Sequence, residues 1–322
     1  MASARAVRTL TFSFAGLRYS CQVLEHPSAR TPLLLVSGGM QSTRLERRFA
    51  EHFARSTTVI ICHLPGTHRS DALPPCHGLD FLAFAMANVL DRLEIPRVHV
   101  VAASYGGPIA YRFAQRFPGS VERLVLAGVM KEMPDAVRAS ALRTLTALGD
   151  ERMADFAREV ADGLLCADPD KPVERRAVAR RLVTRQFERM GPAGRVRYCY
   201  NTRRQLEHLN LDLDAAPSVP ALVFTGEHDV YTQPSACREI ADAFDEAIFT
   251  TIRRADHLFH LERFEATLSL VSWFLMGTPL ASTEDYTEFE RHARCQRPHA
   301  FAATLAPQPA APQPLVFAHE QV

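Results

Sequence analysis

The chain has almost no net charge, no paired cysteine motif and no long apolar run. Lysine and arginine outnumber aspartate and glutamate by 37 to 36, which gives no reason to expect binding to nucleic acid or to a membrane surface. Seven scattered cysteines without a C-x-x-C pair argue against a disulfide framework and indicate free thiols in a reducing compartment. No apolar run approaches the ~20 residues that span a bilayer, and no signal-peptide core is visible. These absences predict a soluble, cytoplasmic protein.

What is present is an alternation of apolar strands and amphipathic helices, which predicts an α/β fold with a mostly parallel, doubly wound sheet. An alternating pattern before residue 25 predicts an antiparallel hairpin at one sheet edge. From 130 to 214 the strand pattern gives way to four predicted helices, which we interpret as an inserted lid. The core is therefore expected to comprise 1–129 and 215–277. Residues 278–322 are expected to be a disordered extension, since 304–315 are rich in proline, alanine and glutamine.

The segment from Val98 to Ala110 predicts a buried strand that turns through Ser104 into a helix. Small residues stand two positions before the serine (Ala102) and two after it (Gly106). A nucleophile elbow requires this spacing, because its strained turn brings backbone segments too close for larger side chains. Ser104 is therefore a candidate nucleophile.

A nucleophilic serine needs a base and an acid that orients the base. Asp229 comes three residues after a predicted buried strand, and His257 follows the last predicted parallel strand. The carboxyl ends of parallel strands share one sheet edge, and the order Ser, Asp, His is that of α/β-hydrolases. We therefore expect Ser104, Asp229 and His257 to form a catalytic triad, although Asp229 alone also fits a helix N-cap.

An oxyanion hole needs two backbone N–H groups near the nucleophile. Tyr105 directly follows Ser104, and Gly38-Gly39-Met40 follows the Leu33–Val36 strand. We expect Gly39 and Tyr105 to supply the two donors.

Other histidines and carboxylates compete for these roles. His260 is three residues from His257 and could face the same pocket, whereas Asp135 lies too far beyond its strand to replace Asp229. His63, His68 and His77 share a loop, but they lack metal-ligand spacing and no carboxylate cluster accompanies them in sequence. We therefore expect no metal site.

The predicted insertion is rich in arginine. Between Lys171 and Arg204 the arginines stand at 175, 176, 180, 181, 185, 189, 195, 197, 203 and 204, against two glutamates. A solvated helix face is one interpretation. The other is a docking surface for an acidic partner or for phosphates, with Arg180, Arg181 and Arg185 as candidates.

From Leu10 to Met276 the chain resembles the α/β-hydrolase superfamily, most clearly at Gly226-Glu227-His228-Asp229 and at Ala255-Asp256-His257. The resemblance implies an eight-stranded sheet and no cofactor. The segments 35–40, 103–107 and 229–232 are similar to a 3-hydroxyacyl-transferring branch of that superfamily. That branch includes the synthases of the hydroxyalkanoyloxy-alkanoate precursor of rhamnolipids and the 3-hydroxyacyl-carrier-protein transacylases and thioesterases.

The chain departs from the branch at three places. Ser37 stands where asparagine is usual, His63 begins a loop that usually begins with aspartate, and Asp256 replaces the glycine before the histidine. The branch implies a 3-hydroxyacyl thioester substrate and, as partner, an acyl carrier protein or coenzyme A.

Taken together, these patterns predict acyl transfer from an ester or thioester through an acyl-serine. The acceptor is either water or the hydroxyl of a second acyl chain. A carboxylesterase or lactonase acting on small esters is the alternative within the same class. A non-catalytic protein that uses this fold for binding is the alternative from another class.

Overall fold

The computed structural model describes residues 7–39 and 43–293. Its elements in chain order are β1 (Val7–Phe14), β2 (Leu17–Leu24), β3 (Leu33–Val36), α1 (Thr43–Phe53), β4 (Val59–His63), α2 (Leu79–Arg92), β5 (Val98–Ala103), α3 (Gly106–Arg116), a 3₁₀ turn (Pro118–Ser120), β6 (Val121–Ala127), α4 (Asp135–Gly149), α5 (Met153–Leu164), α6 (Arg176–Glu188), α7 (Pro192–His208), β7 (Ala221–Gly226), α8 (Pro234–Asp242), β8 (Ala247–Ile252), α9 (Phe259–Glu262), α10 (Phe264–Met276) and β9 (Glu290–His292).

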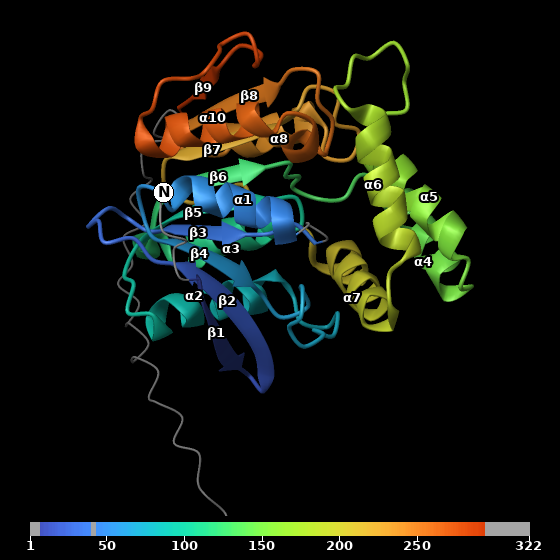
Figure 1. The fold of residues 1–322 in the computed structure, drawn as a ribbon, viewed down its shortest axis with the longest axis horizontal. Coiled ribbons are helices and arrows are strands. Elements are labelled where there is room, and N and C mark those ends of the chain that lie inside the picture. The colour runs from blue at the N-terminus through green and yellow to red at the C-terminus, as the bar shows by residue number, and fades with distance from the viewer. Residues whose placement is uncertain (1–6, 40–42, 294–322) are drawn as a thin grey trace, which may run out of the picture.

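One mixed sheet forms the centre of the molecule, with strand order β1-β2-β4-β3-β5-β6-β7-β8-β9 (Figure 1). The strands from β4 to β8 pair in parallel, and β1, β2 and β9 pair antiparallel at the two edges. Every residue of β3, β4 and β7 is buried, as expected for parallel strands covered on both faces. The mostly parallel, doubly wound sheet and the N-terminal hairpin predicted from the sequence are thereby confirmed.

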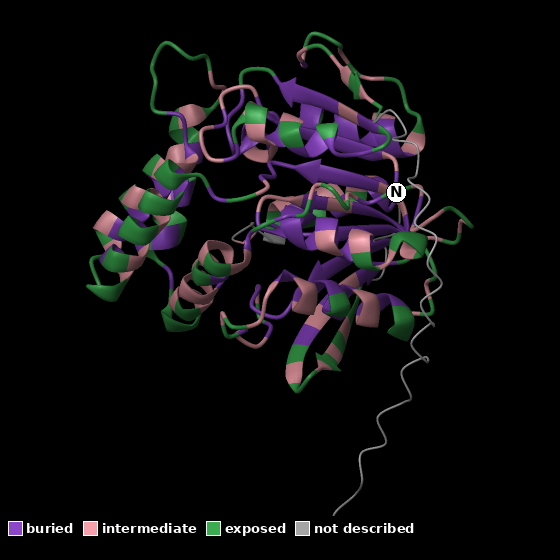
Figure 2. Ribbon diagram, turned by 180° about the vertical axis from the view of Figure 1, so that it is seen from behind, coloured by how far each residue is buried: buried purple, intermediate pink, exposed green. Residues whose placement is uncertain are grey.

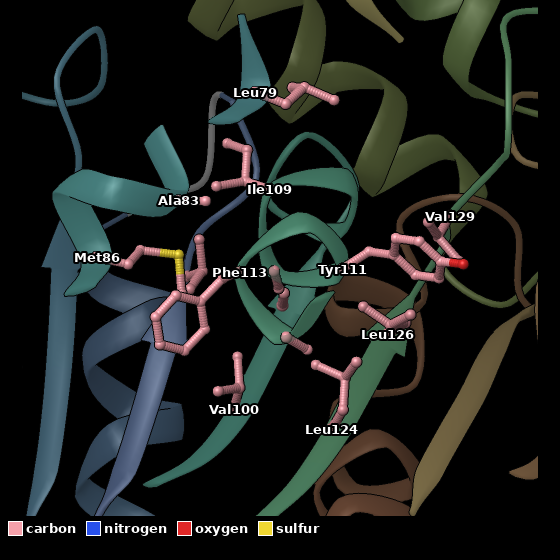
Figure 3. Close-up of a cluster of buried hydrophobic side chains, with 14 of the residues drawn as sticks. Leu79, Ala83, Met86, Val100, Ile109, Tyr111, Phe113, Leu124, Leu126 and Val129 are labelled. Atoms are coloured by element: carbon pink, nitrogen blue, oxygen red, sulfur yellow. The ribbon is translucent and has the colours of Figure 1, made fainter. Parts of the chain in front are cut away.

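Helices cover both faces of the sheet. One face packs against α2, α3 and α8 in a core that includes Met86, Phe113 and Phe244, and Figure 3 shows part of this core between α2, α3, β5 and β6. The opposite face packs against α1 and α10 through residues such as Phe53 and Leu270. Burial is concentrated in the sheet and in the helix faces turned toward it (Figure 2).

Helices α4 to α7 lie between β6 and β7 in the chain, and α4, α5 and α6 stand apart from the sheet (Figure 1). We call α4–α7 the four-helix segment. Its own apolar core contains Phe156, Val183 and Phe187, and it also takes in Leu258, the residue after His257. The segment is therefore packed against the loop that carries a candidate catalytic residue.

Two expectations about the C-terminal part were wrong. The sheet has nine strands rather than eight, because β9 pairs antiparallel with β8. Residues 278–293, expected to be disordered, return to the core, where the buried Tyr286 donates a hydrogen bond from its hydroxyl to the Ala266 carbonyl at 2.8 Å. The remainder of the predicted extension, 294–322, lies outside the described residues. No helix in the described ranges is long and apolar enough to cross a membrane.

Candidate active site

Ser104 occupies the turn between β5 and α3, at the carboxyl edge of the sheet. Its φ of 50° lies in the left-handed region that side chains rarely adopt. Close packing explains why position 106 is glycine. A Cβ there would lie 2.6 Å from the Val36 carbonyl oxygen and 2.8 Å from that of Ser37. Backbone strain and close approach thus shape this turn into an elbow that presents the serine hydroxyl.

The structure brings the three predicted triad residues together. The Ser104 Oγ lies 3.0 Å from His257 Nε2, and His257 Nδ1 lies 2.9 Å from Asp229 Oδ2. Asp229 and His257 are almost fully buried, so these contacts form in a largely water-free environment. The arrangement matches that of a nucleophile, a base and an orienting acid.

Asp229 is held by a set of donors besides the histidine. Its Oδ1 accepts the backbone N–H groups of Tyr231 and Thr232, both at 2.8 Å, and its Oδ2 accepts hydroxyl hydrogen bonds from Thr225 and Thr232. The N-cap position of α8 is Gln233, so Asp229 does not cap that helix. Neither threonine was predicted as a partner of Asp229, although both stand close to it in the sequence, at positions 225 and 232.

Burial and charge set the protonation of this pair. Burial opposes the charged form of His257, but the adjacent Asp229 carboxylate outweighs it and raises the pKa of His257 above its usual value. Burial also opposes ionisation of Asp229, yet the His257 charge and the hydrogen bonds from His257 and the two threonines lower the pKa of Asp229. An ionised aspartate thus stands ready to stabilise an imidazolium ion.

Two glycines let the loop between β8 and α9, which carries His257 and which we call the histidine loop, approach the sheet. At Gly128, whose φ is 62°, a Cβ would lie 3.3 Å from His257 Cε1. At Gly226, the last residue of β7, a Cβ would lie 2.1 Å from the Asp256 carbonyl oxygen. Both positions therefore require glycine if His257 is to reach Ser104.

The two predicted oxyanion donors lie side by side. A Cβ built on Gly39 would be 3.5 Å from the Tyr105 Cβ, and both residues line the same cavity as Ser104. The Tyr105 hydroxyl donates to Asn201 Oδ1 at 3.1 Å and accepts from the fully buried Arg204 at 2.9 Å. Arg204 also donates to the carbonyl oxygens of residues 73, 74 and 77. Helix α7 is thereby tied to the residue that follows the nucleophile, and the oxyanion role stays a prediction.

A cavity of about 650 Å³ lies between this edge of the sheet and the four-helix segment. Ser104 and His257 line it from the sheet, and Val160, Leu164 and Val183 line it from the helices. Its size is within the range of small-molecule sites, and its lining combines apolar walls with a few polar groups. The arrangement suits a substrate with an apolar part.

Asp256, unusual beside the histidine, is integrated into the fold. Its carboxylate accepts the backbone N–H of Cys166 at 3.1 Å and that of Leu258 at 3.0 Å, so it connects the four-helix segment to the histidine loop. Glu262 Oε2 accepts the Asp256 N–H at 2.8 Å. Burial and then the Asp256 charge raise the pKa of Glu262 to about 9, so this carboxyl is protonated at neutral pH.

The remaining candidate histidines lie in different environments. His260 is half-buried and lines the cavity, and desolvation lowers its pKa to about 4 and keeps it neutral at pH 7. His63 and His68 stack, with ring centroids 3.9 Å apart, whereas the His77 ring packs against Phe81. The expectation of no metal site at these histidines stays a prediction, but α1 places one carboxylate, Glu46, beside His63 and His68.

The arginine-rich surface is smaller than the sequence indicated. Arg180 pairs with Asp162, and Arg204 is buried. Arg181 and Arg185 are exposed on α6, so binding of a carrier protein or of coenzyme A there stays a prediction. Among the described residues, six of the cysteines are free thiols.

Comparisons with known proteins agree with this geometry. The alpha/beta hydrolase fold family model matches residues 31–264. A 2-hydroxy-6-oxo-2,4-heptadienoate hydrolase of Pseudomonas putida is 33% identical over 36% of this chain and 45% of its own. A poly(3-hydroxyalkanoate) depolymerase of Ectopseudomonas oleovorans is 35% identical over 30% of this chain and 34% of its own. The chain thus matches less than half the length of these relatives.

Solved structures show the same fold. An alpha/beta hydrolase enzyme from a Medee basin deep-sea metagenome library superposes with a TM-score of 0.74, at 17% identity, over 85% of this chain and 100% of its own. The enol-lactonase of Burkholderia xenovorans gives a TM-score of 0.70 at 21% identity, over 83% of this chain and 100% of its own. With the family model matching most of its length, the chain belongs to the alpha/beta hydrolase fold family.

Proposed function

We propose that the protein is a serine-dependent acyl hydrolase that works through an acyl-serine intermediate. The observation that carries this proposal is the hydrogen-bonded series Ser104–His257–Asp229 at the wall of a cavity of about 650 Å³. A buried series of this kind serves as a nucleophile with its base and orienting acid.

The reaction begins when neutral His257 takes the Ser104 proton at Nε2 while Oγ attacks the substrate carbonyl carbon. The carbonyl oxygen gains the electron pair, and the backbone N–H groups of Gly39 and Tyr105 stabilise it. His257 returns the proton to the leaving alcohol or thiol as the bond to it breaks. Water then attacks the acyl-serine by the same proton relay, which releases the acid and restores Ser104. Asp229 holds His257 in position and stabilises its cationic form.

The substrate class proposed is an ester or thioester with an apolar acyl chain, including 3-hydroxyacyl groups. The proposal of an apolar acyl chain is supported by the apolar side chains of α5 and α6 that line the cavity. The proposal of a 3-hydroxyacyl group is supported by the relative named as a poly(3-hydroxyalkanoate) depolymerase. Transfer to the hydroxyl of a second acyl chain is the corresponding transferase reaction.

Hydrolysis of a carbon–carbon bond in a carboxylate-bearing dienoate is a second candidate. Arg44, Arg185 and Arg189 are exposed and line the cavity, where guanidinium groups suit a substrate carboxylate. A relative named as a 2-hydroxy-6-oxo-2,4-heptadienoate hydrolase supports this candidate.

Labelling with a fluorophosphonate, followed by intact-mass measurement, tests the nucleophile. We expect one adduct on the wild type and none on Ser104→Ala. Ser140→Ala is the matched control, because Ser140 lines the same cavity on α4, and it should label like the wild type. A wild type that stays unlabelled would favour a non-catalytic binding protein.

The substrate panel then separates the candidates. Esters and lactones, 3-hydroxyacyl thioesters and a 2-hydroxy-6-oxo-dienoate are incubated separately, and products are identified by mass spectrometry. A free acid indicates hydrolysis, an acyl-acyl ester indicates transfer, and loss of the dienoate chromophore indicates carbon–carbon cleavage.

A further inference from the structure

Two buried side chains and one half-buried side chain from separate parts of the chain meet near the carboxyl edge of the sheet. Glu46 is in the first turn of α1, His63 ends β4, and His68 is in the loop that follows. Glu46 Oε2 lies 3.4 Å from His63 Nε2 and 3.3 Å from His68 Nε2. None of these residues belongs to the series of Ser104, His257 and Asp229.

Within the described residues, the Glu46 carboxylate makes ion-pair contacts with His63 and His68 and with no lysine or arginine. A buried carboxylate without a lysine or arginine beside it is costly in its charged form unless a cation joins the group.

Hydrogen bonding within the group is incomplete. Glu46 Oε1 and both ring nitrogens of His68 are buried without a hydrogen-bond partner, although such atoms in folded proteins are nearly always satisfied. The Glu46 side chain is only 4% exposed and that of His68 only 11%. His68 also has a φ of 48°, a strained conformation of the kind found at ligand sites.

The spacing of the atoms fits one ion. One donor atom from each of the three side chains lies within 4.8 Å of the others. Ligands about 2.1 Å from a tetrahedral ion are roughly 3.4 Å apart, close to the two separations between Glu46 and the histidines. The rings are stacked, 22° from parallel, so binding one ion through both requires the rings to rotate about their side-chain bonds.

We propose that Glu46, His63 and His68 bind one divalent transition-metal ion, of which zinc is the first to test. Two imidazoles and a carboxylate are ligands that Zn²⁺ accepts, and a water would complete the coordination. The ion neutralises the buried carboxylate and gives one of the unpartnered His68 nitrogens a partner. It joins α1, which follows the Gly39 loop in the chain, to the loop after β4, and thereby stabilises the fold. Its role is separate from acyl transfer.

The test uses the full chain, freed of metal with a chelator and dialysed against ZnCl₂. Bound zinc is counted by mass spectrometry of the elements, and affinity is measured by isothermal titration calorimetry. CoCl₂ then replaces zinc, because the visible absorption of Co²⁺ reports its coordination. We expect one ion per chain, a tetrahedral Co²⁺ spectrum and a raised unfolding temperature.

Glu46→Gln and His68→Asn should each weaken zinc binding on the order of tenfold or more and abolish the Co²⁺ spectrum. Cys76→Ser and His77→Asn are the matched controls, because this exposed thiol and its neighbour offer zinc an alternative surface site. Both should bind zinc like the wild type. Should Glu46→Gln not fold, His68→Asn decides the matter by itself, since His68 is in a loop.

Zinc binding that survives in His68→Asn but disappears in Cys76→Ser or His77→Asn would place the ion elsewhere and overturn the proposal. The absence of stoichiometric binding by the wild type would overturn it too. Fluorophosphonate labelling of Ser104 in the metal-free protein is measured separately, so a failed metal site and a failed nucleophile remain distinguishable.

Discussion

Glu262→Gln tests whether a proton is stored beside the histidine loop. Burial and the Asp256 charge raise the pKa of Glu262 to about 9, whereas a glutamate in the unfolded chain titrates near ~4.3. Between these values the folded protein holds a proton that the unfolded chain has released. The free energy of unfolding contributed by this group is therefore fully present below the lower pKa and is lost as the pH rises through the higher one.

The glutamine variant mimics the protonated carboxyl. Its amide oxygen accepts the Asp256 N–H that Glu262 accepts at 2.8 Å, and its amide N–H is a donor, as a protonated carboxyl is. Glutamine cannot lose a proton, so its stability relative to wild type grows by ~1.4 kcal/mol per pH unit in this window. Between pH 6 and pH 8 the advantage of the variant should increase by about 3 kcal/mol.

Urea unfolding of both proteins at several pH values between 5 and 9 measures this difference. Glu246→Gln is the control, since Glu246 is exposed, and its difference from wild type should stay nearly constant with pH. If the difference between Glu262→Gln and wild type is equally flat, the carboxyl is already ionised at neutral pH and the reasoning is refuted.

Four further outcomes are expected. Asp229→Asn should lower kcat on the order of 10⁴-fold, measured by ester hydrolysis, and a loss under tenfold would contradict its orienting role. The acid limb of the pH profile of kcat/KM should have its midpoint above pH 6.5, because the raised pKa of His257 keeps this base protonated at lower pH. A midpoint below pH 6.5 contradicts the assignment of His257 as the base. Gly106→Ala should destabilise by ~1–3 kcal/mol in urea unfolding, because its Cβ would overlap two carbonyl oxygens. Arg204→Met should destabilise by ~3 kcal/mol or more, since it leaves several buried acceptors without donors, and an unchanged unfolding midpoint would show that α7 is held otherwise.

The strands were predictable because their information is local. Continuous apolar runs at Leu33–Val36 and Ala221–Gly226 are typical of strands buried on both faces, and both became parallel strands of the sheet. The helical segment after His257 is divided at Arg263 into α9 and α10, which no pattern in the sequence indicates. Helix ends depend on the neighbouring chain, so their boundaries were less predictable than their existence.

The proximity of Ser104, Asp229 and His257 was predictable for a topological reason. Each residue follows a parallel strand, and parallel strands deliver the residues after them to one edge of the sheet. Their hydrogen bonds confirm this proximity, while their catalytic roles await the labelling experiment.

The sequence indicated the burial of Glu46 only indirectly, through its spacing from apolar residues on α1. It lies one and two helical turns before Ala50 and Phe53, so it shares their buried helix face. That spacing is a sign of burial, but it does not identify the two histidines that the carboxylate meets. Those contacts depend on how α1 packs against the loop after β4.

The sequence by itself determined the alternation of strands and helices, the order of the sheet-edge residues and the elbow at Ser104, because each depends on short-range pattern and backbone sterics. Only the tertiary structure decided that β9 closes the sheet, that Asp256 connects the four-helix segment to the histidine loop, and that Glu46 joins His63 and His68. These features rest on contacts between residues far apart in the chain, where burial and the satisfaction of polar groups, rather than local propensity, select the arrangement.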